Sequence, residues 1–348
     1  MLGNLSVSAI GLSCMLYSQG RNGPPDEGAS IAAIRTAYEA GCTYFDTSEH
    51  YGRKPFHPGH NEELLGRALG GHRQGIIISS KFHINWSDFE RTHSVYQVIR
   101  DHLDRSLKNL GTDYLDLYFM HRVNPQVSTA DVAAAMGKLI DEGLIRGWGM
   151  SQVPVQTIAE GHEALPLTAV EDAFSLARTD ADKDILPYCQ RSGIGFVAFS
   201  PIASYYLETD RPKPAKSDDP NEAFLARLAE RRWVANRPIT YRLQELSRAN
   251  HASPAQISLA WMLHKYPNLV PVPGSKHAER IYENLAGADI ILTDEEVADI
   301  DRRLEYSSRH DAQVVKEMRR GRRQTKPKAK SKQGMRGDRN RLHGAGGN

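Results

Sequence analysis

Residues 43–52 read TYFDTSEHYG, and the rest of the chain repeats the pattern that starts here. The first three residues are β-branched or aromatic, which predicts a short strand that ends at Asp46. A polar loop follows, with Tyr51 five residues after the acid and Gly52 at its close. Taken alone, the two residues could be a loop cap and a packed aromatic. An acid at a strand end followed by a loop tyrosine is also a frequent active-site layout in α/β proteins.

Strand-like and helix-like segments alternate in strict order on both sides of this stretch. The strand-like runs GIIIS and GFVAF lack polar alternation, which is typical of parallel strands buried on both faces. The expected strands are residues 7–12, 43–46, 75–82, 114–122, 144–152, 167–173, 194–201 and 268–275. Eight such units predict a (β/α)₈ TIM barrel. The alternative, a doubly wound sheet, would carry a G-x-G-x-x-G turn after its first strand, and none is present there.

Caps and breakers set the expected helix boundaries. Asn61 is expected to cap a helix over residues 61–71, and Gly111 to end another over residues 95–111. Residues 83–94 are expected to form a loop. Residues 202–238 are expected to form a long polar insertion.

Composition limits the class of protein. Three widely spaced cysteines, Cys14, Cys42 and Cys189, predict no disulfide framework and favour a reducing, cytoplasmic compartment. No apolar run approaches the ~18 residues of a membrane span, so no membrane association is expected. The N-terminus lacks the charged region and the long apolar region of a signal peptide.

Charge divides the chain into an expected barrel domain, residues 1–308, and a basic tail, residues 309–348. The tail holds 13 Lys/Arg against 3 Asp/Glu, while the remainder has a net charge of −8. Such a polar segment buries too little apolar surface to order itself, which predicts a disordered, solvated appendix. The alternative is an arm that binds polyanions, although no aromatic residue is interleaved for base stacking.

Four residues at or after strand ends suit proton donation to a carbonyl: Asp46, Tyr51, Lys81 and His121. A tyrosine could donate the proton, and a nearby ammonium should lower its pKa. An aspartate would keep that lysine charged, and a histidine could orient the substrate oxygen. The set contains no cysteine or second histidine in metal-ligand spacing, so no metal is expected, and no G-x-S-x-G motif for a serine nucleophile is present.

The stretches FDTSEHYG, SSKF, LDLYFMHRV, GWGMSQ, GFVAFSPI and VPVPGSKHAERIYENL occur in this order between about residues 7 and 304. Together they resemble the aldo-keto reductases, in particular the bacterial and plant type, and more distantly the potassium-channel β-subunits. The resemblance implies an NADPH-dependent enzyme that reduces an aldehyde or ketone. It implies that Tyr51 is the general acid, Lys81 and Asp46 its tuning pair, and His121 the substrate-orienting residue.

The resemblance also implies a cofactor site. Its matching positions are Ser151, Gln152, Glu171, Phe199, Ser200, Pro201, Ile202, Gly274, Ser275, Lys276, Arg280, Glu283 and Asn284. Two positions depart from the family, which usually has Asn at Gln152 and Gln at Glu171. An ionised Glu171 cannot donate a hydrogen bond to the carboxamide, and its charge would favour the oxidised nicotinamide. The family's opening hairpin is mostly missing.

Two classes of function therefore stay open: a reductase of small carbonyl compounds, and an NADP(H)-binding regulatory protein of low activity. The intact four-residue set favours the enzyme, and the altered carboxamide contacts favour the binding protein. Expected substrate-pocket walls are Tyr17, Phe82 and Trp86, whose aromatic character suits an apolar or aromatic carbonyl.

Overall fold

The computed structural model describes residues 1–19, 26–52, 54–202, 210, 212–213 and 220–324. The chain forms two units, of which the first comprises Met1–Arg211 and Asn236–Ser307. This unit contains all eight strands of the described chain. The second unit comprises Pro212–Ala235 and Ser308–Asn348, and its described part is largely helical.

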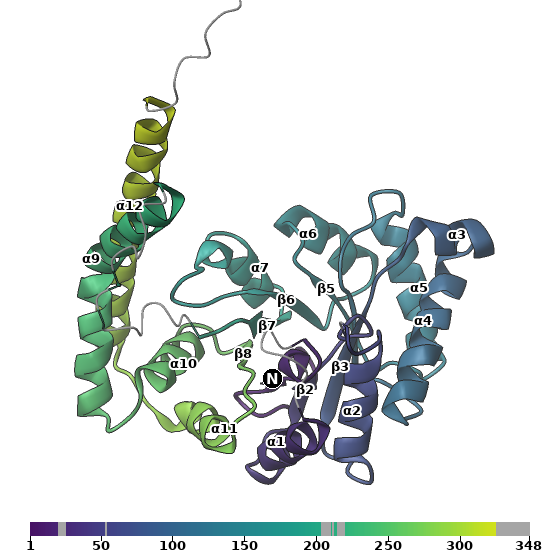
Figure 1. The fold of residues 1–348 in the computed structure, drawn as a ribbon. Helices are drawn as coiled ribbons and strands as arrows, with labels where there is room; N and C mark the ends of the chain where they lie inside the picture. Colours follow the sequence, from purple (N-terminus) through teal and green to yellow (C-terminus); the bar gives the residue numbers. More distant parts are fainter. Residues whose placement is uncertain (20–25, 53, 203–209, 211, 214–219, 325–348) are drawn as a thin grey trace, which may run out of the picture. The chain divides into compact units, whose positions relative to one another are not determined.

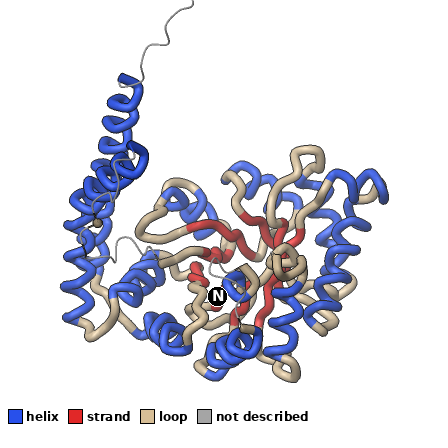
Figure 2. The backbone as a smooth tube through the Cα atoms, viewed as in Figure 1, coloured by secondary structure: helices blue, strands red, loops and turns tan. Residues whose placement is uncertain are grey.

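Eight parallel strands form the sheet of the first unit, in the order β1 to β8. They are β1 (Leu12–Ser13), β2 (Tyr44–Asp46), β3 (Ile77–Phe82), β4 (Leu117–Met120), β5 (Trp148–Ser151), β6 (Ala169–Ala173), β7 (Gly195–Phe199) and β8 (Leu269–Val272). A backbone hydrogen bond of 3.0 Å from Gly11 N to Pro271 O brings the two sheet edges together. Figure 2 shows the strands at the centre of this unit, with helices around them. The predicted (β/α)₈ barrel is confirmed.

Helices follow the strands, and those that lie wholly in the first unit cover the outside of the barrel (Figure 1). Those before β5 are α1 (Glu27–Glu39), α2 (His60–Leu69), α3 (Trp86–Thr92), α4 (Val95–Leu110) and α5 (Thr129–Asp141). Those after β5 are α6 (Val155–Ala164), α7 (Ile185–Arg191), α9 (Pro220–Ala249), α10 (Pro254–Lys265), α11 (Ala278–Leu285) and α12 (Asp294–Gln324). Local sequence sets several ends: Ser253 forms a capping box with Gln256, and Gly111 ends α4 at φ 64°.

Apolar side chains fill the barrel interior, and a larger cluster lies between the sheet and the helices. The first residues of the chain belong to the interior cluster, since Leu2 and Leu5 are buried against residues of the inner strand faces. They form a small turn, with Leu2 N donating to Leu5 O at 2.9 Å. A Cβ at Gly195, at the start of β7, would come within 2.7 Å of Leu2. This short segment therefore closes the amino-terminal end of the barrel, where the sequence suggested a missing hairpin.

Three helices differ from the expectations. Residues 86–92 form α3 within the expected loop. α9 joins the second half of the expected polar insertion to the next helix and continues through Pro238. α12 continues past the expected boundary at residue 308 as far as Gln324, because this stretch is rich in helix-forming charged residues and contains no proline. The remainder of the basic tail, residues 325–348, lies outside the described residues.

Candidate active site

The carboxyl ends of the strands surround a cavity of about 780 Å³ in the barrel unit. β2 ends at Asp46, β3 carries Lys81 one residue before its end, and His121 follows β4 directly. Because parallel neighbours end at one rim, three strands bring these residues together. The lining residues are Ser13, Met15, Leu16, Gln19, Asp46, His50, Tyr51, His121, Arg122, Gln152, Glu171, Phe199, Ser200, Pro201, Ile202, Val272, Pro273 and Gly274.

Lys81 lies beneath the cavity and is shared by two carboxylates. Its Nζ donates to Asp46 Oδ1 at 2.5 Å and to the carbonyl oxygen of Thr47 at 2.9 Å. Glu171 Oε2 lies 3.3 Å from the same ammonium. All three charged side chains are buried, and Lys81 is fully inaccessible. Removal of either Lys81 or Asp46 would leave an uncompensated buried charge, so these two residues stabilise each other.

The cluster sets the protonation of its members. Burial opposes the charge on Lys81, but the Asp46 and Glu171 carboxylates outweigh it and raise the Lys81 pKa above its ordinary value. Lys81 is therefore an ammonium at neutral pH. Burial, followed by the charge of Asp46, raises the pKa of Glu171 to about 8, although Lys81 acts in the opposite direction. The Glu171 side chain therefore loses its proton and becomes negatively charged as the pH rises through about 8.

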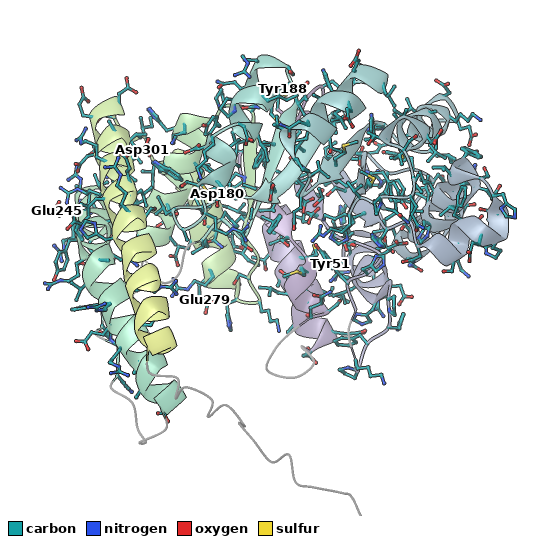
Figure 3. All side chains as sticks on the ribbon, turned by 90° about the horizontal axis from the view of Figure 1, so that it is seen from above. Tyr51, Asp180, Tyr188, Glu245, Glu279 and Asp301 are labelled. Atoms are coloured by element: carbon teal, nitrogen blue, oxygen red, sulfur yellow. The ribbon has the colours of Figure 1, made fainter. Side chains whose placement is uncertain are left out.

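Tyr51 lies on the loop between β2 and α2 and lines the cavity. Figure 3 labels it among the side chains. Its backbone N donates to Ser48 O at 3.0 Å, and its carbonyl accepts from Asn61 N at 3.2 Å. Lys81 Nζ lies 5.4 Å from the centre of the phenol ring. Burial raises the pKa of Tyr51 above its ordinary value, and Lys81 lowers it by less. The expected net lowering of this pKa is wrong, because desolvation of a phenolate outweighs one nearby cation.

His121 lies edge-on to Tyr51, with ring centres 6.2 Å apart. Burial, followed by the charges of Lys81 and Arg122, lowers the pKa of His121 to about 3, so the imidazole is neutral at neutral pH. Its Nδ1 lies 3.4 Å from Ser48 Oγ, which accepts a hydrogen bond from His50 N at 3.3 Å. The Ser48 hydroxyl can therefore donate its proton to Nδ1, an arrangement in which the His121 proton is on Nε2.

Asn61 anchors the loop that carries Tyr51. Its Oδ1 accepts from Thr47 Oγ1 at 2.6 Å, and its Nδ2 donates to Cys14 O at 2.8 Å and to Ser18 Oγ at 2.9 Å. The expectation that Asn61 caps α2 is wrong, because Gly59 is the N-cap and Asn61 lies buried inside the first turn. The buried amide instead joins segments that follow β1 and β2.

Part of the expected cofactor set lines the cavity. Two of these residues, Gln152 at φ 53° and Ser200 at φ 50°, have left-handed backbone, which is uncommon for residues other than glycine. Ser151 does not line the cavity, and its hydroxyl lies 3.5 Å from Arg122 Nη1. The lining members of the set are Gln152, Glu171, Phe199, Ser200, Pro201, Ile202 and Gly274.

The rest of the expected cofactor set follows β8, at the start of α11 or within it, and does not line the cavity. Ser275 is held by its carbonyl, which accepts from Tyr17 OH at 2.6 Å. Arg280 Nη1 pairs with Glu283 Oε2 at 2.5 Å. Asn284 is buried, and Lys276 has no ion pair with any described residue. Lys276 is therefore more available to an incoming anion than Arg280 is.

The expected pocket walls differ from the observed ones. Tyr17 and Phe82 are both fully buried and do not line the cavity. Phe82 packs on Tyr118 at a ring-centre distance of 4.8 Å, so both expected walls are core residues. The side chain of Trp86 lies outside the described part of the chain. Of the lining residues that the sequence did not predict, only His50 and Arg122 could have been suspected, because they are close in sequence to Tyr51 and His121. The others are Ser13, Met15, Leu16, Gln19, Val272 and Pro273.

Known proteins share both the sequence and the barrel. The aldo/keto reductase family profile matches residues 10–305. The probable aldo-keto reductase 1 of Glycine max is 30% identical over 300 residues, which cover 84% of each chain. A thermostable aldo-keto reductase crystallised with the inhibitor epalrestat is 28% identical, with a TM-score of 0.67 over 87% of this chain and 98% of that one. An aldo-keto reductase from Klebsiella pneumoniae, in complex with NADPH, is 26% identical with a TM-score of 0.67, over 86% of this chain and 93% of its own.

The fold and the rim of charged residues define the class of protein as an oxidoreductase built on a (β/α)₈ barrel. The profile match covers most of the sequence, and the soybean relative reaches 30% identity. The chain belongs to the aldo/keto reductase family.

The described residues contain neither a membrane-spanning helix nor a metal-binding cluster. No helix among them is long and apolar enough to cross a membrane. No group of three or more His, Cys, Asp or Glu side chains among them is arranged to hold a metal ion.

Proposed function

We propose that this chain is an NADPH-dependent oxidoreductase that reduces an aldehyde or ketone to an alcohol, with Tyr51 as the proton donor. The observation that carries the proposal is the convergence of Asp46, Tyr51 and His121 on one cavity above the buried Lys81. Family membership and the NADPH complex of the Klebsiella relative support the choice of cofactor.

The residues present fit such a cofactor. A cavity of about 780 Å³ is within the usual range of about 300–1,000 Å³ for ligand pockets. Phe199 and Ile202 supply apolar surface for a nicotinamide ring, and Gln152 can both donate to and accept from its carboxamide. Lys276 would hold the 2′-phosphate, since it has no ion pair with any described residue.

The reaction needs a hydride at the carbonyl carbon and a proton at the carbonyl oxygen. When bound, NADPH supplies the hydride. Tyr51 donates its hydroxyl proton to the oxygen, which gives the alcohol and leaves a phenolate. The Lys81 ammonium stabilises that phenolate, and Asp46 keeps the ammonium charged and in place. Water then returns the proton to Tyr51, whose raised pKa keeps it protonated between turnovers.

His121 orients the carbonyl. A neutral imidazole with its proton on Nε2 can donate one hydrogen bond to the carbonyl oxygen without competing as an acid. Ser48 holds this tautomer through Nδ1. The low pKa of His121 therefore suits a positioning role beside Tyr51.

Tyr51→Phe tests the assignment. Loss of the hydroxyl should lower kcat/KM for an aldehyde about 10²–10⁴-fold. The dissociation constant of NADPH, followed by quenching of tryptophan fluorescence, should stay near that of wild type. Tyr241→Phe, at an exposed tyrosine of α9, is the matched control. A Tyr51→Phe enzyme that kept more than half of the rate would assign the proton to another group.

A second function is favoured by one observation. Glu171 places a carboxylate where the family has an amide, and it pairs with Lys81. We therefore retain the alternative of an NADP(H)-binding barrel of low activity. Such a protein would show fluorescence quenching by NADPH but no NADPH oxidation with a panel of aldehydes, ketones and quinones.

A further inference from the structure

Arg122 lies directly after His121 and lines the same cavity with an exposed side chain. Its Nη1 donates to the carbonyl oxygen of His121 and lies 3.5 Å from Ser151 Oγ. Both partners are neutral oxygens, and neither neutralises the guanidinium. The described residues provide no ion pair for Arg122 and no partner for its Nη2 or Nε. Part of the donor fork therefore has no partner among the described residues at the mouth of the active site.

Three imidazoles, those of His50, His83 and His121, lie near Arg122, and the lowered pKa values of His83 and His121 keep these two rings neutral at neutral pH. The ring centre of His50, a lining residue, lies 6.1 Å from that of His121 and 6.0 Å from that of His83. His83 Nδ1 is buried without a hydrogen-bond partner among the described residues. Burial lowers the pKa of His83, and the neighbouring His50 and Arg122 lower it further. Glu49 acts in the opposite direction, and the effect of Arg122 shows that the charge of its guanidinium is felt at His83.

The carboxylates near this region have other partners. Asp46 and Glu171 pair with Lys81 below the cavity. Glu49 contacts His102 Nδ1 at 2.7 Å and His50 Nδ1 at 3.3 Å. Asp172 Oδ1 accepts a hydrogen bond from the backbone N of Ala173 at 2.6 Å. Burial raises the pKa of Asp172, and the charge of Arg122 lowers it by less and without a direct contact.

We propose that the carbonyl substrate carries a carboxylate, which Arg122 binds while the carbonyl oxygen lies between Tyr51 and His121. A guanidinium presents paired N–H donors that match the two oxygens of a carboxylate. The position of Arg122, next to His121 in sequence and at the same rim, places the anion-binding group beside the reacting oxygen. This proposal names the substrate class and rests on the proposed function.

The test compares 4-formylbenzoate with its neutral methyl ester, each reduced with NADPH at low ionic strength. Charge-assisted hydrogen bonds predict a kcat/KM about 10- to 100-fold higher for the acid in the wild-type protein. Arg122→Gln should reduce this acid-to-ester ratio to about one, and Arg122→Lys should retain part of it. Arg302→Gln, at a residue of α12 that is 69% exposed, is the matched control and should keep the wild-type ratio.

A binding experiment keeps the proposal testable without turnover. Benzoate and benzamide are titrated calorimetrically into the complex with NADP⁺, and benzoate should bind about tenfold or more tightly in wild type but not in Arg122→Gln. Equal affinity of the two ligands in wild type overturns the proposal, even if the ester is reduced well and the proposed function holds. Arg122→Gln could instead reduce activity on the acid and the ester equally and also weaken NADPH binding. That result would overturn the proposal too, because it would assign Arg122 to the cofactor. Preferred binding of benzoate without reduction of either aldehyde would support the anion site and contradict the reductase.

Discussion

Replacing Glu171 with Gln should make the stability of this protein less dependent on pH. The carboxylate is buried, and its pKa of about 8 lies well above the ordinary value of 4.5. At about 1.4 kcal/mol per pKa unit, ionising Glu171 costs about 5 kcal/mol more in the folded protein than in the unfolded chain. The folded state thus holds a proton that the unfolded chain releases, so this contribution is fully present below pH 4.5 and is lost as the pH rises to 8.

The comparison is a set of thermal melts of wild type and Glu171→Gln between pH 5 and pH 9. At pH 5 the carboxyl is protonated and nearly isosteric with the amide, so the melting temperatures should nearly coincide. At pH 9 the variant should be more stable by several kcal/mol, which corresponds to a shift of about 2–4 °C per kcal/mol for a domain of this size. Glu163→Gln, at an exposed residue of α6, is the control and should give no pH-dependent difference.

The same variant should bind NADPH more tightly or turn over faster near pH 8, because an amide can donate as well as accept at the carboxamide. An equal difference in melting temperature between the two proteins at pH 5 and at pH 9 would contradict the predicted effect of Glu171 on stability. A wild-type protein more stable than the variant at pH 9 would also contradict it, since the ion pair of Glu171 with Lys81 would then outweigh the desolvation of the carboxylate.

Two further predictions concern anions. Lys276→Ala should raise the dissociation constant of NADPH far more than that of NADH, because NADPH alone has a 2′-phosphate; Arg280→Ala should do less, because Arg280 already pairs with Glu283. Equal weakening of both cofactors in fluorescence titrations would contradict this. Removal of residues 309–348 should weaken retention on heparin in a salt-sensitive way, since it deletes a net charge of +10. Unchanged elution would exclude the tail as a polyanion-binding arm.

The sequence by itself determined the barrel and one rim of the site. Strand order follows from local periodicity, and parallel strands that are neighbours in sequence must end at the same edge. Asp46, Lys81 and His121 could therefore be brought together without coordinates. The helix that continues to Gln324 was missed because charge and low hydropathy suggested disorder, although the same residues are good helix formers.

Tertiary structure alone decided which side chains reach the cavity and which charges they carry. Tyr17 and Phe82 were expected to be pocket walls, yet they pack in the core, while Arg122 and His50 reach the mouth. Glu171 lies 90 positions after Lys81, and only the curvature of the sheet brings its carboxylate within 3.3 Å of the ammonium. The pKa of Tyr51 rises for the same reason: burial is a property of the assembled barrel, and desolvation there outweighs the nearby lysine.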